Sequence, residues 1–167
     1  FIDISERKAQ EEHNRQLLME NETILSNALV GIVYLKHRRV VSCNRRFEEI
    51  LGYSTGELIG ASSALFYDTP ESFQRVGERA YAALAEKRSY SEELMLKHKD
   101  GHTFPGVLNG CAIDPAHPND GSIWIYADIS ERRQAQQETY KLLQAVEQAP
   151  VSIVITNLMG VIEYVNP

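Results

Sequence analysis

One phrase occurs twice in the chain, and this repeat constrains the fold more than any single residue does. Residues 1–8 read Phe-Ile-Asp-Ile-Ser-Glu-Arg-Lys, and residues 126–133 read Tyr-Ala-Asp-Ile-Ser-Glu-Arg-Arg. Each copy is followed by a polar stretch typical of a helix, a Leu-Leu pair and a short β-branched run. Such self-similarity indicates an array of similar units. We therefore expect the tail of one unit, a complete second unit and the beginning of a third.

The composition suits one globular domain with connectors. The chain has 167 residues, 43% of them hydrophobic, and a net charge of −6. The acidic balance argues against nucleic-acid binding, which needs a basic surface. A basic run, Lys36-His37-Arg38-Arg39, is interpreted as a solvated hairpin turn. No apolar run reaches the roughly 20 residues that span a bilayer. We expect a cytoplasmic segment, with any membrane anchor of a longer parent lying elsewhere.

The first half of the complete unit predicts a hairpin followed by helices. Residues 31–35 and 40–43 are β-rich runs around a polar turn. Asn44 is a good helix cap, and Gly52 is a good helix stop. Thr69-Pro70-Glu71 predicts the start of a longer helix, running to about residue 87.

The second half predicts three strands, over residues 89–98, 102–113 and 122–129, with a hairpin turn at Asp100-Gly101. Strands at both ends with helices between them indicate an α+β fold, with one antiparallel sheet and helices on one face. A concave space between the long helix and the sheet is the expected place for a ligand.

The segments around this unit are expected to be connectors and parts of its neighbours. We assign residues 1–8 to the tail of a preceding unit, 9–26 to a connector helix and 27–133 to the complete domain. Residues 134–148 are a second connector helix, and 149–167 begin the next unit. The seven-residue spacing from Leu17 to Ile24 allows a short coiled coil, although a single amphipathic helix stays an alternative. We expect a homodimer through these connectors, and an unpaired terminal hairpin that seeks a partner.

This order of elements resembles a PAS domain with its C-terminal PAC segment. The residues that carry the resemblance are Asn44-x-x-Phe47-x-x-Ile50-Leu51-Gly52-Tyr53, Glu57-Leu58-Ile59-Gly60, Lys99-Asp100-Gly101, Gly121 and Asp128-Ile129-Ser130-Glu131-Arg132-Arg133. The resemblance implies a five-stranded sheet in the order 2-1-5-4-3. It also implies a sensing or relaying unit of a bacterial multi-PAS protein. Its output domain would be a diguanylate cyclase/phosphodiesterase or a histidine kinase.

The family assigns signal coupling to the segment that leaves the last strand, and we carry that role onto Asp128, Ser130 and Arg132. Ser130 is expected to cap the outgoing helix, so that a small shift of the strand would tilt or rotate it. The connector from Asp3 to Gly31 is four residues longer than the one from Asp128 to Ser152, which is close to one helical turn of about 3.6 residues.

The residues argue against two cofactors that are familiar in this family. Haem-binding members resemble one another in a histidine on the long helix, and residues 70–87 contain none. Photosensory LOV members need a reactive cysteine before that helix, and residues 60–67 contain none. The two cysteines, Cys43 and Cys111, have neither zinc spacing nor a disulfide framework. Non-covalent flavin stays an option, because Trp124 and the tyrosines could flank a ring system, with core packing as the alternative. The cofactor is unknown.

If a pocket exists, we expect its lining to come from the long helix, the segment before it and the inner face of the sheet. The apolar candidates are Tyr34, Phe47, Leu65, Phe66, Phe73, Val76, Leu94, Leu96, Leu108 and Ile125, and the polar candidates are Tyr67, Tyr81, Ser91 and Asn109. The parity of the strand over residues 102–113 stays open, because Leu108 and Asn109 point to opposite faces. A packed interior without ligand is the alternative.

Three functional hypotheses remain. The chain is an input domain that binds a small molecule, a ligand-free dimerisation and relay module, or an enzyme. Walker A, zinc and nucleophile-elbow motifs are missing from the sequence. We therefore expect no enzymatic activity in this segment, and any catalysis would belong to another domain of the parent.

Overall fold

The computed structural model describes residues 12, 13, 15, 16, 28–86 and 88–167. The chain divides into two compact units, Phe1–Asp128 and Ile129–Pro167, and each is described by itself. The expected tail over residues 1–8 lies outside the described residues, as does most of the expected connector over 9–26. Within that connector, residues 12, 13, 15 and 16 are helical.

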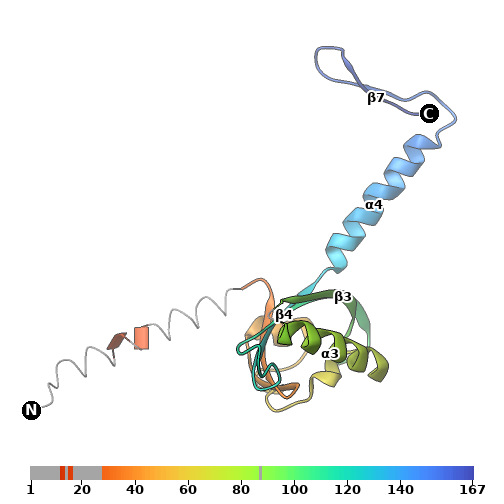
Figure 1. Ribbon diagram of the computed structural model, residues 1–167. Coiled ribbons are helices and arrows are strands. Elements are labelled where there is room, and N and C mark those ends of the chain that lie inside the picture. The colour runs from red at the N-terminus through yellow and green to blue at the C-terminus, as the bar shows by residue number, and fades with distance from the viewer. Residues whose placement is uncertain (1–11, 14, 17–27, 87) are drawn as a thin grey trace, which may run out of the picture. The chain divides into compact units, whose positions relative to one another are not determined.

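A five-stranded antiparallel sheet forms the first unit, in the order β2-β1-β5-β4-β3 (Figure 1). This confirms the predicted order. The strands are β1 (Gly31–Lys36), β2 (Arg39–Cys43), β3 (Tyr90–Lys97), β4 (Thr103–Ala112) and β5 (Ser122–Asp128). The sequence therefore located every strand of this sheet to within a residue or two of its ends.

The helices of this unit begin where their cap residues predict. In α2 (Arg45–Leu51) the Asn44 side chain accepts a hydrogen bond from the backbone N–H of Phe47, and Gly52 ends the helix in the left-handed conformation. In α3 (Pro70–Ala85) the Thr69 side chain accepts from the N–H of Ser72. A short 3₁₀ helix, η1 (Ser63–Phe66), precedes α3. Both α2 and α3 contact the sheet, and α3 lies over β3 and β4 (Figure 1).

The register of the sheet decides which side chains face the helices. Directly opposite residues of antiparallel strands project to the same face. The pairs Val33 with Trp124 and Leu108 with Tyr126 are buried and therefore define the inner face. These side chains, together with the apolar faces of α2 and α3, make one hydrophobic core.

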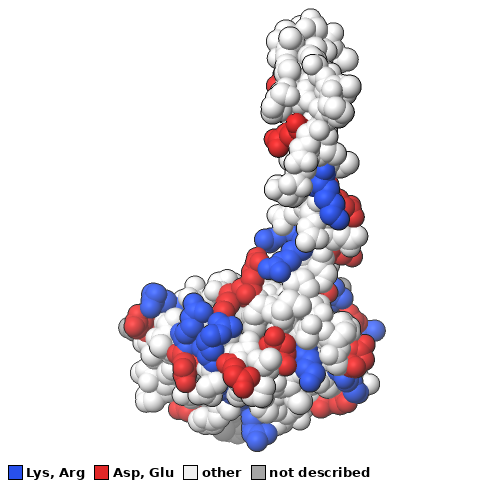
Figure 2. All heavy atoms as spheres, turned by 90° about the vertical axis from the view of Figure 1, so that its right-hand side faces the viewer, with Lys and Arg blue, Asp and Glu red and all other residues white. Residues whose placement is uncertain are grey.

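The second unit contains α4 (Ser130–Glu147) and a hairpin of β6 (Val154–Thr156) and β7 (Ile162–Val165). No side chain of α4 is buried. The hairpin surface is largely uncharged (Figure 2), because residues 148–167 include a single charged residue, Glu163. Among the helices of the described residues, none has the length and apolar character needed to cross a membrane.

Candidate functional site

Aromatic rings in mutual contact fill the interior in which a pocket was predicted. The rings of Phe47 and Phe66 are 5.1 Å apart between centroids and meet edge to face. The Tyr126 ring is also 5.1 Å from Phe47. Of the predicted lining residues, those that are buried are Phe47, Phe66, Tyr67, Val76, Leu96 and Leu108, while Phe73, Tyr81 and Leu94 are partly buried and pack against them. These residues belong to the core, and their role as the lining of a ligand pocket stays a prediction.

Other predicted lining residues do not face the interior. Tyr34, Ser91, Asn109 and Ile125 lie on the outer face of the sheet. The cause is strand parity, because Ile125 is the neighbour of the inward-facing Trp124 and is 38% exposed. Leu65 is 47% exposed, since η1 turns the adjacent Phe66 inward. The expectation that these residues line a pocket is corrected on that ground.

Arg38 brings a positive charge to the edge of the aromatic core. Its Nη2 donates to the Phe73 carbonyl at 2.6 Å, and its guanidinium lies 3.3 Å from the centroid of the Phe73 ring. The side chain also fills the space in front of Gly77, where a Cβ would lie 2.3 Å from Nη1. Arg38 is therefore partly buried and packed, and is not the solvated turn residue that the basic run predicted.

Hydroxyl groups continue this polar feature into the core. Burial raises the pKa of Tyr67 and raises the pKa of Tyr126 well above its usual value, and the two hydroxyls are hydrogen-bonded to each other. The indole Nε1 of Trp124 donates to Ser122 Oγ at 2.9 Å, and the Tyr81 hydroxyl is 3.4 Å from the same oxygen. The sequence analysis proposed Tyr67 and Tyr81 as polar candidates, but it did not predict their contacts with Tyr126 and Ser122, which lie far away along the chain.

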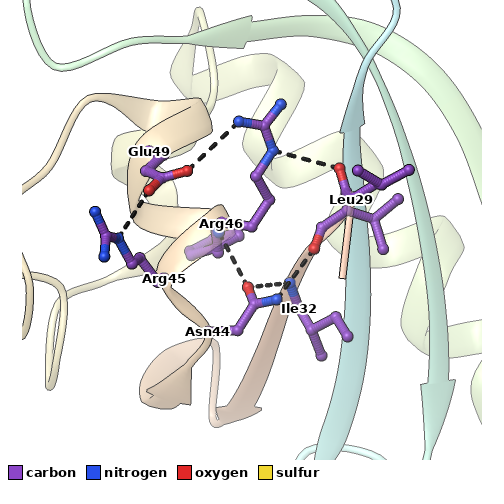
Figure 3. Close-up of polar contacts among 8 residues, drawn as sticks. Leu29, Ile32, Asn44, Arg45, Arg46 and Glu49 are labelled. Atoms are coloured by element: carbon purple, nitrogen blue, oxygen red, sulfur yellow. Dashed lines mark hydrogen bonds and ion pairs between the residues drawn. The ribbon is translucent and has the colours of Figure 1, made fainter. Parts of the chain in front are cut away.

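Asn44 ties the beginning of the sheet to α2 (Figure 3). Its Oδ1 accepts hydrogen bonds from the N–H of Ile32 at 2.8 Å and of Phe47 at 3.0 Å. Its Nδ2 donates to the Val30 carbonyl at 3.1 Å. Arg46 adds a bond to the Leu29 carbonyl at 3.3 Å. A helix cap was predicted here, and the structure adds the connection to the incoming strand.

Asn166 repeats two of these bonds in the second unit. Its Oδ1 accepts from the N–H of Ile153 at 2.7 Å, and its Nδ2 donates to the Val151 carbonyl at 3.0 Å. The same Nδ2 also donates to the Val146 carbonyl, in the last turn of α4, at 3.2 Å. The hairpin of the second unit is thereby bonded to the end of the helix that precedes it.

The predicted coupling residues lie where the last strand gives way to α4. Asp128 is the last residue of β5, and Ser130 is the first residue of α4. The cap position is occupied by Ile129, with no side-chain cap hydrogen bond. The expectation that Ser130 caps the helix is therefore wrong, because the helix begins at Ser130 itself. The signalling role of Asp128, Ser130 and Arg132 stays a prediction.

The sheet order, the helices on one face and the aromatic core define a PAS domain. The PAS domain family model matches residues 28–131, which is most of the chain. The chain therefore belongs to the PAS family.

Relatives and solved structures agree with this assignment. The chain is 32% identical over 143 residues to the sensor protein TdiS of Thauera aromatica, covering 86% of this chain and 26% of TdiS. It is 30% identical over 125 residues to the bacterioopsin transcriptional activator of Halobacterium salinarum, covering 70% of this chain and 18% of that protein. The chain thus spans about a quarter or less of the length of these relatives.

Among solved structures, the PAS domain of a LuxR-family transcriptional regulator from Burkholderia thailandensis, in complex with ethanol, has a TM-score of 0.62 and 28% identity, covering 65% of this chain and 96% of that one. The PAS domain of an HTR-like protein from Haloarcula marismortui shares the fold, with a TM-score of 0.59 and 21% identity, covering 73% of this chain and 99% of that one. The chain is a PAS sensor domain of the kind that signalling proteins contain.

Proposed function

We propose that this domain relays conformational change between helical connectors within a tandem array of PAS units. The observation that carries the proposal is the pair of equivalent asparagines. Asn44 and Asn166 hold the first strand of their hairpins through the same bonds, and Asn166 also holds the preceding helix through the Val146 carbonyl. A rotation of that helix would then displace the hairpin through these bonds.

The packed interior supports relay in preference to sensing. The aromatic rings around Phe47 touch one another, so a displacement of α2 changes the packing of Tyr126 on β5. β5 ends at Asp128, immediately before α4 begins. The path from β1 to the end of β5 thus runs through contacts within one core. The output domain of the parent would be a histidine kinase or a diguanylate cyclase/phosphodiesterase, and this segment would be non-catalytic.

Dimerisation through α4 would give the relay a second helix to act against. The helix carries a stripe at spacings of four and three residues, formed by the apolar Ala135, Leu142 and Val146 and by Thr139, whose hydroxyl donates to the Ala135 carbonyl. Leu142 is 69% exposed, and the neighbouring Leu143 and Tyr140 are 52% and 62% exposed. A single helix of this length is marginal in water without packing on a partner. A parallel copy of α4 would cover the stripe.

Light scattering on the chain tests the dimer. Leu142→Glu should convert a species of twice the chain mass into a single chain at micromolar concentration. Gln137→Glu adds the same charge on the opposite face of α4 and should leave the mass unchanged. A wild-type chain that is monomeric at that concentration would contradict the dimer.

Insertions into α4 test the relay in the parent protein. One or two residues added after Gln136 rotate the following part of the helix by about 100° each, while four residues restore nearly a full turn. We expect insertions of one or two residues to deregulate autophosphorylation or cyclic di-GMP turnover, and the insertion of four residues to restore its regulation. The same insertions in the loop over residues 114–121 are the control. An output that is indifferent to the length of α4 would contradict the relay.

Small-molecule sensing is the second candidate, and Arg38 is the observation that favours it. A guanidinium beside the hydroxyls of Tyr67 and Tyr126 would suit a small ligand with an anionic or carbonyl group. Native mass spectrometry beside denaturing mass spectrometry separates the two functions. Excess mass in the native spectrum alone would show a ligand, and a bare chain or bare dimer would favour relay.

A further inference from the structure

The tip of the β3–β4 hairpin gathers two histidines and an aspartate that the proposed relay does not use. His98 follows β3 and His102 precedes β4, and the N–H of His98 donates to the His102 carbonyl at 2.9 Å. Gly101 has a φ of 98°, which closes the short turn between them. Because the two histidines lie opposite each other, their side chains project to the same face, and their rings stack at 4.5 Å.

Asp100 points its carboxylate at both rings. Its Oδ1 is 2.6 Å from Nδ1 of His102 and 3.0 Å from Nδ1 of His98. The backbone N–H of His102 also donates to this oxygen at 3.0 Å.

The side chains of His98 and Asp100 bring two potential ligand atoms together. The backbone N–H of Asp100 donates to Nδ1 of His98 at 3.3 Å, so this nitrogen is an acceptor in the neutral ring. An imidazole nitrogen has one lone pair, and a metal ion would take it in place of this long hydrogen bond. Asp100 Oδ1 lies 3.0 Å from the same nitrogen, close enough for both atoms to bind one ion.

We propose that His98, Asp100 and His102 bind a divalent transition-metal ion of the zinc, nickel or copper class. The three ligand atoms lie within 4.8 Å of one another. Tetrahedral metal bonds of about 2.0–2.1 Å place ligand atoms roughly 3.3 Å apart, so small side-chain rotations complete the site. Imidazole nitrogens with one carboxylate favour this class over calcium or magnesium, which prefer oxygen ligands alone. Water would fill the remaining coordination position.

The base of the site is held against α2. The His98 ring packs on Gly52, where an added Cβ would lie 2.0 Å from Nε2, and the His98 side chain is 24% exposed. The backbone N–H of Lys99 donates to the Leu51 carbonyl at 2.9 Å, and Lys99 Nζ is 2.7 Å from a Glu57 carboxylate oxygen. Such docking reduces the ordering that metal binding would otherwise require.

Another histidine provides a matched control. His117 Nδ1 lies 3.0 Å from Asp114 Oδ2 in the loop before β5, and both side chains are exposed. This pair has the same chemistry as His102 with Asp100 but is not part of a three-residue group. A histidine–aspartate pair alone should bind metal much more weakly than the hairpin group.

Calorimetric titration of the untagged chain with zinc chloride tests the site. We expect one ion per chain with a dissociation constant in the micromolar range. His102→Gln should weaken binding at least tenfold, and His117→Gln should leave it unchanged. Electron paramagnetic resonance of the copper-loaded chain should show hyperfine coupling to two imidazole nitrogens, and to one after the His102 substitution.

Trp124 fluorescence during urea unfolding shows whether each variant is folded, and the exposed His102 makes its variant the safer one. Two results would overturn the site. One is the absence of saturable binding at one equivalent of zinc by the folded wild type. The other is an equal loss of affinity in the His117 and His102 variants, which would indicate adsorption by surface histidines.

Discussion

Replacing Asn44 with alanine should destabilise the first unit more than an ordinary surface substitution would. The Asn44 side chain is 8% exposed, accepts from the N–H groups of Ile32 and Phe47 and donates to the Val30 carbonyl. Alanine makes none of them. The backbone bond from the N–H of Asn44 to the Ile32 carbonyl, at 2.9 Å, stays in place, so the loss belongs to the side chain.

The magnitude follows from the groups left without partners. Loss of an N-cap costs about 0.5–2 kcal/mol. The N–H of Ile32 is left without its acceptor, which costs about 1–3 kcal/mol in a buried setting. Because the Ile32 bond is only partly buried, we expect a total of about 2–4 kcal/mol in the free energy of unfolding. Asn44→Asp keeps the acceptor oxygen but not the donor to Val30, so its loss should be smaller.

Urea unfolding followed by tryptophan fluorescence measures this loss in the first unit alone. Trp124 is the single tryptophan of the chain and lies in β5. Asn109→Ala is the matched control, because Asn109 is exposed on the outer face of the sheet, and its change should stay within about 0.5 kcal/mol. The slope of free energy against urea concentration should be the same in all variants.

The reasoning about Asn44 is refuted if the Asn44→Ala loss is as small as that of Asn109→Ala. It is also refuted if Asn44→Asp is as damaging as alanine, because the acceptor oxygen would then contribute nothing.

Three further predictions follow from the core and the cysteines. Gly110→Ala places a Cβ 2.4 Å from the Trp124 ring, so unfolding should cost about 1–3 kcal/mol less by the same urea assay. Burial holds the pKa of Tyr126 well above its usual 10.0. The stability that comes from its neutral form is therefore complete below about pH 10 and is lost as the pH rises further. Urea titrations at pH 8–11 measure this loss. Burial, with a smaller effect of a nearby carboxylate, raises the pKa of Cys43 to about 11, so only about one Cys43 thiol in a thousand is ionised at pH 8. Iodoacetamide should therefore label the exposed Cys111 first, which peptide mapping would show.

The sequence predicted the order of elements well because their boundaries are chemically marked. Asn44 and Gly52 bracket α2, and the Thr69-Pro70 pair begins α3, as their cap chemistry requires. The breaker-rich loop over residues 114–121 separates β4 from β5. These signals are local, and the PAS resemblance then supplied the sheet order that local signals do not contain.

Strand parity could not be predicted with the same success. In β5 the inward side chains include Trp124 and Tyr126, while Ile123 and Ile125 between them are 38% exposed. All four residues are large and apolar, so hydrophobic alternation gives no phase for this strand. The register with β1 and β4 decides it, and that register depends on the whole sheet.

Arg38 shows a different reason for failure. Both His37 and Arg38 have positive φ angles, 47° and 60°, which identify a tight two-residue turn. The sequence around them, with no glycine or asparagine at either position, does not suggest this geometry. The turn aims the Arg38 guanidinium at Phe73, a residue 35 positions away along the chain. Only the folded chain shows that contact.

The sequence predicted only part of the bonding at Asn44 and Asn166. The repeat aligned Asn166 with Asn44, and each side chain accepts a hydrogen bond from the N–H of an isoleucine, Ile153 or Ile32. A cap for α2 would need only the bond to Phe47. The additional bonds to the incoming strand occur at both asparagines, and at Asn166 they extend to the carbonyl of Val146 in α4. A side chain that binds strand and helix end together resists their relative motion, and this resistance is the physical basis of the relay that we propose.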